Sequence, residues 1–412
     1  MLTDVEAELL LICARQSLPD SLVSRAIEIL DESPLRWPYL TQEASRHGVA
    51  PLLFKHFESL GERVGVEQRN EFRQAYVKSA FRARVHEDAL AVVVSRMVEA
   101  GVVPVLLKGM SLTRTVYPDA ALRPFADIDL LIATDKIDIA KAVLISCGYS
   151  LAPELWSEKF NRRYHMNLPF ARKAHSPVHI ELHWKLTDHF SLVRFDEQAM
   201  LARTRSVAVG NAAANVLDPA DELVYLAAHV DNHGYLNRAM LDGCDKRFLL
   251  HALSGNRLIW FTDLHELVCR SVDWNLVCAR ARHAHADAPL AISLQLTRAL
   301  LGTPIDTTLL SDLPKADWLR RKISRHVRSL ANAGDEHLSA ANFNRLFLST
   351  RKGFELRLIR LIDIWTYIFP PPELAQRAYA MHVLRAISGC LLMLVQLVFY
   401  RASRQFRTHD AV

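Results

Sequence analysis

The chain has 412 residues, half of them hydrophobic and 23% charged, a composition typical of globular proteins that excludes a disordered or fibrous chain. Its net charge of +5 is small for this length and does not by itself indicate a nucleic-acid-binding protein. The six cysteines include no Cys-x-x-Cys pair, which excludes the common zinc modules and suits reduced thiols. The acidic N-terminus lacks the basic residues of a signal peptide, so we expect a cytoplasmic protein.

The first part of the chain, residues 1–101, is predicted to be helical. Apolar residues recur there at helical intervals, most clearly between residues 66 and 100. Gly101 follows this stretch, and glycine commonly ends a helix because it adopts the left-handed backbone conformation without steric cost.

After Gly101 the pattern changes to short apolar strands that alternate with helices. Strands are predicted at residues 103–107, 127–132, 165–171 and 178–184, and helices at residues 111–117 and 136–146. Such alternation indicates a small mixed sheet with helices packed on it.

From about residue 187 onward the pattern is again that of helices. The clearest segments are 219–230, 258–269, 274–285 and 288–301. The expected fold class is therefore α+β, with a small mixed-sheet domain at 102–186 embedded between helical regions at 1–101 and 187–412.

Two features of the C-terminal region bear on whether the protein binds an anionic partner or a membrane. Basic residues interleave with apolar ones at 315–328 and 345–360, which predicts either solvated helix faces or a surface for an anionic partner such as RNA or acidic lipid. The apolar run 386–400 is shorter than the roughly 20 residues of a membrane-spanning helix. It is therefore either a packed helix or a peripheral membrane contact.

Two aspartates share one face of the second predicted strand. Because strand side chains alternate, Asp127 and Asp129 point to one side while Ile128 and Leu130 point into a core. Neighbouring carboxylates repel each other, and a divalent cation with a preference for oxygen ligands removes that conflict.

The fourth predicted strand repeats this arrangement. Ile180 and Leu182 alternate with Glu181 and His183, so a strand placed beside the first would bring Glu181 to the two aspartates. Three carboxylates can hold two Mg²⁺ ions, with Mn²⁺ as the alternative, and such ions bind a triphosphate and activate an attacking hydroxyl.

The turn before these acids suits a phosphate group. Gly109 lies between a strand and a helix, where backbone N–H groups can point at phosphate oxygens, and Ser111 can add a hydroxyl donor. Lys108 and Arg123 can neutralise phosphate charge. The alternatives are that Ser111 caps its helix, that both cations are merely solvated, or that Arg123 anchors the aspartates.

These motifs resemble the DNA polymerase beta-type nucleotidyltransferases, and in particular a bacterial family described as uncharacterised nucleotidyltransferases. The resemblance rests on Leu-Leu-Lys-Gly at 106–109, on Arg123 followed by Asp-Ile-Asp-Leu at 127–130, and on Glu-Leu-His-Trp at 181–184. It implies a two-metal enzyme in which Asp127, Asp129 and Glu181 are the catalytic and metal-binding residues.

The resemblance also implies the reaction. An acceptor hydroxyl would attack the α-phosphate of a nucleoside triphosphate, ATP or another, and pyrophosphate would leave; the acceptor is a small molecule, a protein or an RNA. Met110 stands where the superfamily usually has a small residue. This departure motivates the alternative hypothesis of a catalytically degenerate fold that acts as a nucleotide sensor or an interaction scaffold.

Several further side chains are candidates for the same site. His183 follows Glu181 on its strand, and we assign it to substrate binding. His229 and His233 have the i, i+4 spacing of a helical metal site, but we expect His229 to contact substrate or to pack between helices. Asp263 either lines the nucleotide site or makes a buried hydrogen bond.

Overall fold

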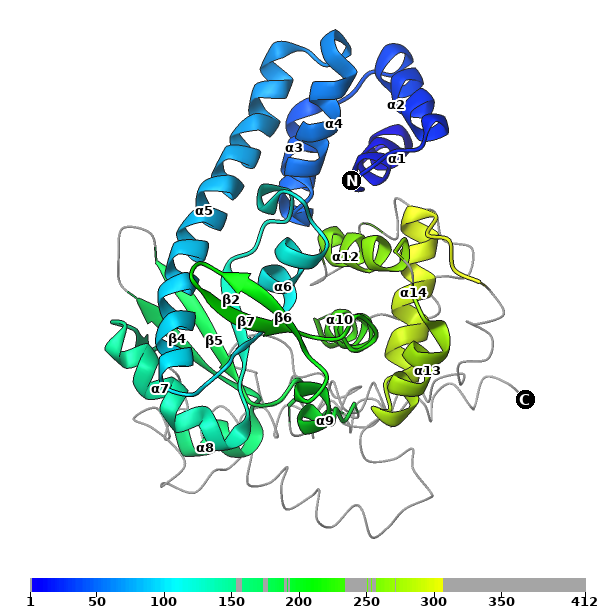
Figure 1. The fold of residues 1–412 in the computed structure, drawn as a ribbon. Coiled ribbons are helices and arrows are strands. Elements are labelled where there is room, and N and C mark those ends of the chain that lie inside the picture. Colours follow the sequence, from blue (N-terminus) through cyan, green and yellow to red (C-terminus); the bar gives the residue numbers. More distant parts are fainter. Residues whose placement is uncertain are drawn as a thin grey trace, which may run out of the picture. The chain divides into compact units, whose positions relative to one another are not determined.

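The computed structural model describes most of the first three quarters of the chain (Figure 1). The described residues are 2–152, 158–172, 177–188, 191, 193–233, 250, 253, 257–270 and 272–306. The basic stretches 315–328 and 345–360 and the apolar run 386–400 lie outside them, so the partners expected there stay predictions. Among the described residues, no helix is both long and apolar enough to cross a membrane.

The chain divides into two compact units. The first comprises Met1–Leu151, Pro169–Leu186 and Phe195–Ala316, and the second comprises Ala152–Leu168, Thr187–Arg194 and Asp317–Val412. Helix α8 (Glu158–Tyr164) belongs to the second unit. The residues of the candidate site all belong to the first unit.

Helices form the N-terminal region, as the sequence predicted. They are α1 (Asp4–Cys13), α2 (Asp20–Glu32), α3 (Trp37–His47), α4 (Ala50–Leu60), the short 3-10 helix η1 (Gly61–Arg63) and α5 (Val66–Glu99). Helix α1 begins with a capping box in which Thr3 and Glu6 each accept a hydrogen bond from the other's backbone N–H. Gly101 follows α5 with φ +74, so the predicted helix end is confirmed.

A seven-stranded mixed sheet follows, and it confirms the α+β class. Its strands are β1 (Val105–Leu106), β2 (Asp127–Leu131), β3 (Ser150–Leu151), β4 (Asn167–Arg172), β5 (Val178–His183), β6 (Arg205–Val209) and β7 (Ala212–Val216). Their order across the sheet is β3-β4-β5-β2-β1-β7-β6. Strand β2 lies parallel to β5 and antiparallel to β1. The helical elements among strands β1 to β3 are α6 (Lys108–Thr115), η2 (Ala120–Leu122), η3 (Thr134–Lys136) and α7 (Ile137–Ser146).

Strands β6 and β7 were not anticipated from the sequence. They form a hairpin around Gly210, which has φ +56, and β7 extends the sheet by pairing in parallel with β1. Four of the ten strand residues are alanine, which has low strand propensity, so the pattern carried little signal. A Cβ atom at Gly210 would lie 3.0 Å from the Cβ of Ala91 on α5, so this turn packs closely against that helix.

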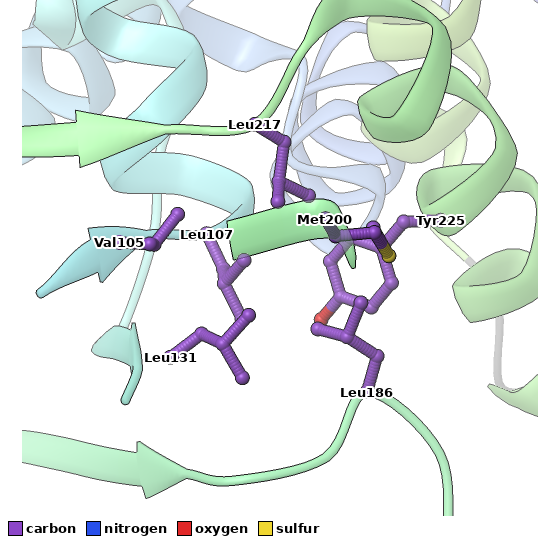
Figure 2. Packing of buried hydrophobic residues seen from close by; sticks show 7 residues of the cluster. All are labelled: Val105, Leu107, Leu131, Leu186, Met200, Leu217 and Tyr225. Atoms are coloured by element: carbon purple, nitrogen blue, oxygen red, sulfur yellow. The ribbon is translucent and has the colours of Figure 1, made fainter. Parts of the chain in front are cut away.

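The two faces of β2 differ in character. Ile128 and Leu130 are fully buried on one face, while Asp129 and Leu131 share the other. Leu131 belongs to a buried cluster that also contains Val105, Leu107, Leu186, Met200, Leu217 and Tyr225 (Figure 2). The acidic side chains therefore lie next to this buried apolar cluster on the same face of the sheet.

A short helix that the sequence did not predict, α9 (Glu197–Leu201), precedes β6. After β7 come four helices in segments that the sequence predicted, α10 (Pro219–His233), α12 (Leu258–Val268), α13 (Trp274–His283) and α14 (Asp287–Leu301), counted among the described residues. Helices α10, α12, α13 and α14 pack on one another, and α14 also packs on α1. The buried Arg15 fixes that last contact, because its guanidinium donates to the carbonyl oxygens of Leu11 and Leu301 at 2.7 and 2.6 Å.

Candidate functional site

The parallel pairing of β2 and β5 brings acidic residues from two segments together. Asp129 is paired in register with Glu181, so their side chains emerge on the same face of the sheet. Ligand atoms of Asp129, Glu181 and His183 all lie within 4.8 Å of one another. Asp129 and His183 are buried, whereas the side chain of Glu181 keeps 31% of its surface exposed. This group can hold a metal ion that remains open to a ligand on the Glu181 side.

His183 is the member of this group that was not predicted from the sequence to be a metal ligand. Its Nε2 atom lies 3.0 Å from Asp129 Oδ1 and 3.2 Å from Glu181 Oε2. Burial alone lowers the pKa of His183, but the two carboxylates outweigh burial and raise it above the ordinary value. The spacing of His183 in the sequence could have indicated this position, because a residue two positions after Glu181 on a strand points to the same face of the sheet.

Asp127 stands beside this group at the start of β2. The group of mutually close ligand atoms does not include it, and within the described part of the chain its carboxylate makes no hydrogen bond or ion pair. Burial raises the pKa of Asp127 to about 6, and the negative charges of Asp129 and Glu181 add to this effect. A nearby cation would relieve that crowding of like charges. Its role as a metal ligand stays a prediction.

Lys108 already neutralises part of the acidic charge. Its Nζ atom lies 2.8 Å from Asp129 Oδ1, the same oxygen that His183 approaches. Burial alone would raise the pKa of Asp129, but Lys108 and His183 hold it far below its usual range. Lys108 also has φ +49, a left-handed conformation that costs a non-glycine residue about 1–2 kcal/mol. The surrounding fold therefore holds this lysine in a strained position at the carboxylates.

Gly109 allows helix α6 to begin close to the segment that precedes β2. A Cβ atom at Gly109 would lie 2.7 Å from the Cβ and 3.0 Å from the Cγ of Phe125. Phe125 is buried, and its ring contacts the ring of His86 on α5, so it has little room to move. Met110, the departure from the superfamily pattern, is buried as well.

We expect Gly109→Ala to destabilise the protein by about 1–3 kcal/mol, because the new methyl group must displace Phe125. The same displacement should weaken triphosphate binding, since Gly109 adjoins Lys108. Urea unfolding and calorimetry measure the two effects. Gly65→Ala is a suitable control, because its Cβ would meet only the flexible end of Gln68. A Gly109→Ala protein as stable as that control would contradict the expected clash.

Ser111 has a buried partner that the sequence did not reveal. Its hydroxyl donates to Glu222 Oε1 at 2.5 Å, and both side chains are buried. The bond joins α6 to α10, so we interpret Ser111 as an anchor for the helix that begins at Lys108. Burial raises the pKa of Glu222 to about 7.

Glu222→Gln is expected to stabilise the protein above pH 7 by about 3 kcal/mol relative to the natural chain. The folded-state pKa of about 7 lies above the ordinary 4.5, so ionisation favours the unfolded chain. The natural protein therefore loses stability as the pH rises from about 4.5 through 7, and glutamine does not ionise. Urea unfolding of both proteins at pH 4.5, 6 and 8 measures the difference, which should vanish at the lowest pH. A difference independent of pH would contradict the assignment.

Arg123 is engaged in a buried ion pair. Its Nε and Nη2 atoms donate to the carboxylate of Asp263 on α12, with the shortest distance 2.6 Å, and Tyr117 donates its hydroxyl to the same carboxylate at 2.8 Å. All three residues are buried. Of the roles considered for Arg123, this arrangement favours anchoring of the segment that leads to Asp127. Asp263 makes the buried hydrogen bonds that were one of its two expected roles.

His229 lies in a row of rings on α10 and α12. It is half-buried, and its ring centroid is 5.1 Å from that of Trp260 and 6.4 Å from that of Tyr225. The side chain of His233 is outside the described residues. Tyr225 was not recognised from the sequence, because a tyrosine in an apolar helix face is usually a core residue. Burial and the charges of Asp129 and Glu181 raise its pKa, although Lys108 opposes them.

Comparison with known proteins agrees with this arrangement. A family model described as "Uncharacterised nucleotidyltransferase" matches residues 33–302, about two thirds of the chain. The matched region starts before α3 and ends just after α14, so it contains every residue of the candidate site. No curated protein and no solved structure matches the chain. Because the family model covers more than half of the sequence, this chain belongs to the uncharacterised nucleotidyltransferase family.

Proposed function

We propose that this protein is a metal-dependent enzyme that transfers a nucleoside monophosphate from a nucleoside triphosphate to the hydroxyl group of an acceptor. The observation that carries the proposal is the convergence of Asp129, Glu181 and His183 within 4.8 Å, beside Lys108, in a chain of this family.

The donor atoms fit a divalent cation of the expected kind. Carboxylate oxygens from Asp129 and Glu181, with Asp127 as a third acid nearby, suit Mg²⁺ or Mn²⁺. An imidazole nitrogen from His183 is a further ligand that manganese and softer ions accept more readily than magnesium does. When bound, such ions would stabilise negative charge on the phosphates and lower the pKa of the attacking hydroxyl.

In the proposed reaction, the acceptor oxygen forms a bond to the α-phosphorus while the bond from that phosphorus to the bridging oxygen breaks, and pyrophosphate leaves. Glu181, the exposed member of the group, accepts the proton of the acceptor hydroxyl. Lys108, which pairs with Asp129 at 2.8 Å, would neutralise triphosphate charge once a cation took its place at the carboxylates. The backbone at Gly109 contacts the phosphates. His229 lines the substrate, His183 contacts the carboxylates of Asp129 and Glu181, and Ser111 and Arg123 position these groups.

Calorimetry with ATP, GTP, CTP and UTP, with Mg²⁺, with Mn²⁺ and with a chelator, tests substrate binding. A pyrophosphate-release assay in the presence of a cell extract, with radiolabelled nucleotide to identify the acceptor, then tests turnover. Metal-dependent binding followed by label transfer supports the proposal. Metal-dependent binding without release on any acceptor would favour the nucleotide sensor or scaffold instead. Absence of binding with either ion would refute both.

A further inference from the structure

Four aromatic rings form a continuous row within the first unit. Tyr225 and His229 lie one helical turn apart on α10, with ring centroids 6.4 Å apart. The ring of Phe195 extends the row from Tyr225, at 6.1 Å, and the ring of Trp260 on α12 extends it from His229, at 5.1 Å. Three separate segments of the chain therefore contribute to one aromatic surface.

The row passes the acidic site at Tyr225. Tyr225 packs in the buried cluster with Leu107 and Leu131 (Figure 2). Leu107 directly precedes Lys108, and Leu131 follows Asp129 on the same face of β2. The charges of Lys108, Asp129 and Glu181 also act on the Tyr225 hydroxyl and shift its pKa. Tyr225 is thus beside the groups that we assign to the triphosphate and the metal, and His229 and Trp260 continue the row from it.

The exposure of the rings distinguishes this row from an ordinary core cluster. Tyr225 is only 3% exposed, but Phe195, His229 and Trp260 each keep part of their surface accessible. By contrast, Phe57 and Phe72, which form a ring pair at 5.0 Å between α4 and α5, are both fully buried. An aromatic residue that is partly exposed can present part of its ring to a planar ligand, and every nucleobase has a π-face that stacks on such a ring.

We propose that this row is the platform on which the base of the nucleoside triphosphate stacks, an inference that rests on the proposed function. The triphosphate lies at Lys108 and Gly109, and the base lies along His229 and Trp260. Recognition by stacking tolerates all four bases, because it uses no hydrogen-bond pattern. Purine triphosphates should bind more tightly than pyrimidine triphosphates, since a purine covers more ring surface.

Calorimetry on the full chain with Mg²⁺ separates the platform from the phosphate site, with ATP and inorganic tripolyphosphate as the two ligands. Trp260→Ala should weaken ATP binding by about tenfold or more and leave tripolyphosphate affinity unchanged. Trp260→Phe should restore most of the ATP affinity, because it keeps an aromatic face. Trp37→Ala is the matched control, since Trp37 is also half-buried and has a ring contact of 5.9 Å with Phe57, but lies on α3.

The two ligands make each failure distinguishable. Unchanged ATP affinity in Trp260→Ala, with normal ATP binding by the natural chain, would overturn the platform and leave the proposed function standing. Equal losses for ATP and tripolyphosphate in Trp260→Ala, persisting in Trp260→Phe, would show that Trp260 serves the fold and would also overturn the platform. Failure of the natural chain to bind either ligand would refute the proposed function itself, and the platform with it.

Discussion

Asp129→Asn is expected to weaken magnesium-dependent triphosphate binding on the order of 100-fold or more, since even residues that support a metal ligand cost 10- to 100-fold. Asp129 is the buried centre of the ligand group, and its Oδ1 atom meets both Lys108 and His183. An amide removes the negative charge that a cation needs and leaves the Lys108 ammonium facing an uncharged group. Calorimetric titration of ATP at fixed Mg²⁺ measures the loss, and the pyrophosphate-release assay should show no turnover.

The charge change needs its own control. Asp135→Asn removes an exposed aspartate in η3, outside the ligand group, and should leave affinity unchanged. Thermal unfolding of each variant shows whether the fold persists. The double variant Asp127→Asn with Asp129→Asn removes both acids of β2. If that folded double variant retained magnesium-dependent affinity, the metal would not be held at these acids.

Asp263→Ala should destabilise the protein by about 3–5 kcal/mol, the usual cost of removing one partner from a buried ion pair. Arg123 is charged and buried, and among the described residues the substitution would leave its guanidinium with only the backbone oxygen of Pro124 as a partner. The Tyr117 hydroxyl would lose its acceptor too. Urea unfolding followed by circular dichroism measures the change.

A double-mutant cycle tests whether the ion pair itself is responsible. Arg123→Leu combined with Asp263→Leu should cost less than the sum of the single changes, because no charge is left unpaired. Tyr117→Phe should cost only about 1 kcal/mol, since it removes one hydrogen bond. If Asp263→Ala were no less stable than Tyr117→Phe, the ion pair would not anchor the fold.

The same ion pair matters for function because of where Arg123 stands. The short segment 123–126 leads directly into Asp127, and contacts with other elements fix it. Arg123 pairs with Asp263, and Phe125 packs close to Gly109. The carbonyl oxygen of Ala126 lies 3.1 Å from Nε2 of His86. We therefore expect the Asp263 variants that still fold to bind triphosphate more weakly than the natural chain, although Asp263 contacts no ligand in the proposed reaction.

Much of the candidate site could be predicted from the sequence alone. Alternation along a strand places Asp127 and Asp129 on one face and Glu181 and His183 on one face, because side-chain direction is a local property of extended backbone. Gly101 marked the end of helix α5, because glycine adopts a positive φ without steric cost. The four predicted strands and the α+β class followed from such local periodicity.

Tertiary structure alone decided which of these faces meet and which polar groups become partners. The register that sets Asp129 beside Glu181 depends on β2 and β5 being neighbours, although they lie about 50 residues apart in the chain. The pairing of Arg123 with Asp263 spans 140 residues, and that of Ser111 with Glu222 spans 111. The aromatic row from Phe195 to Trp260 needs two helices and a loop to pack together. Such contacts result from long-range packing, which no local pattern of residues records.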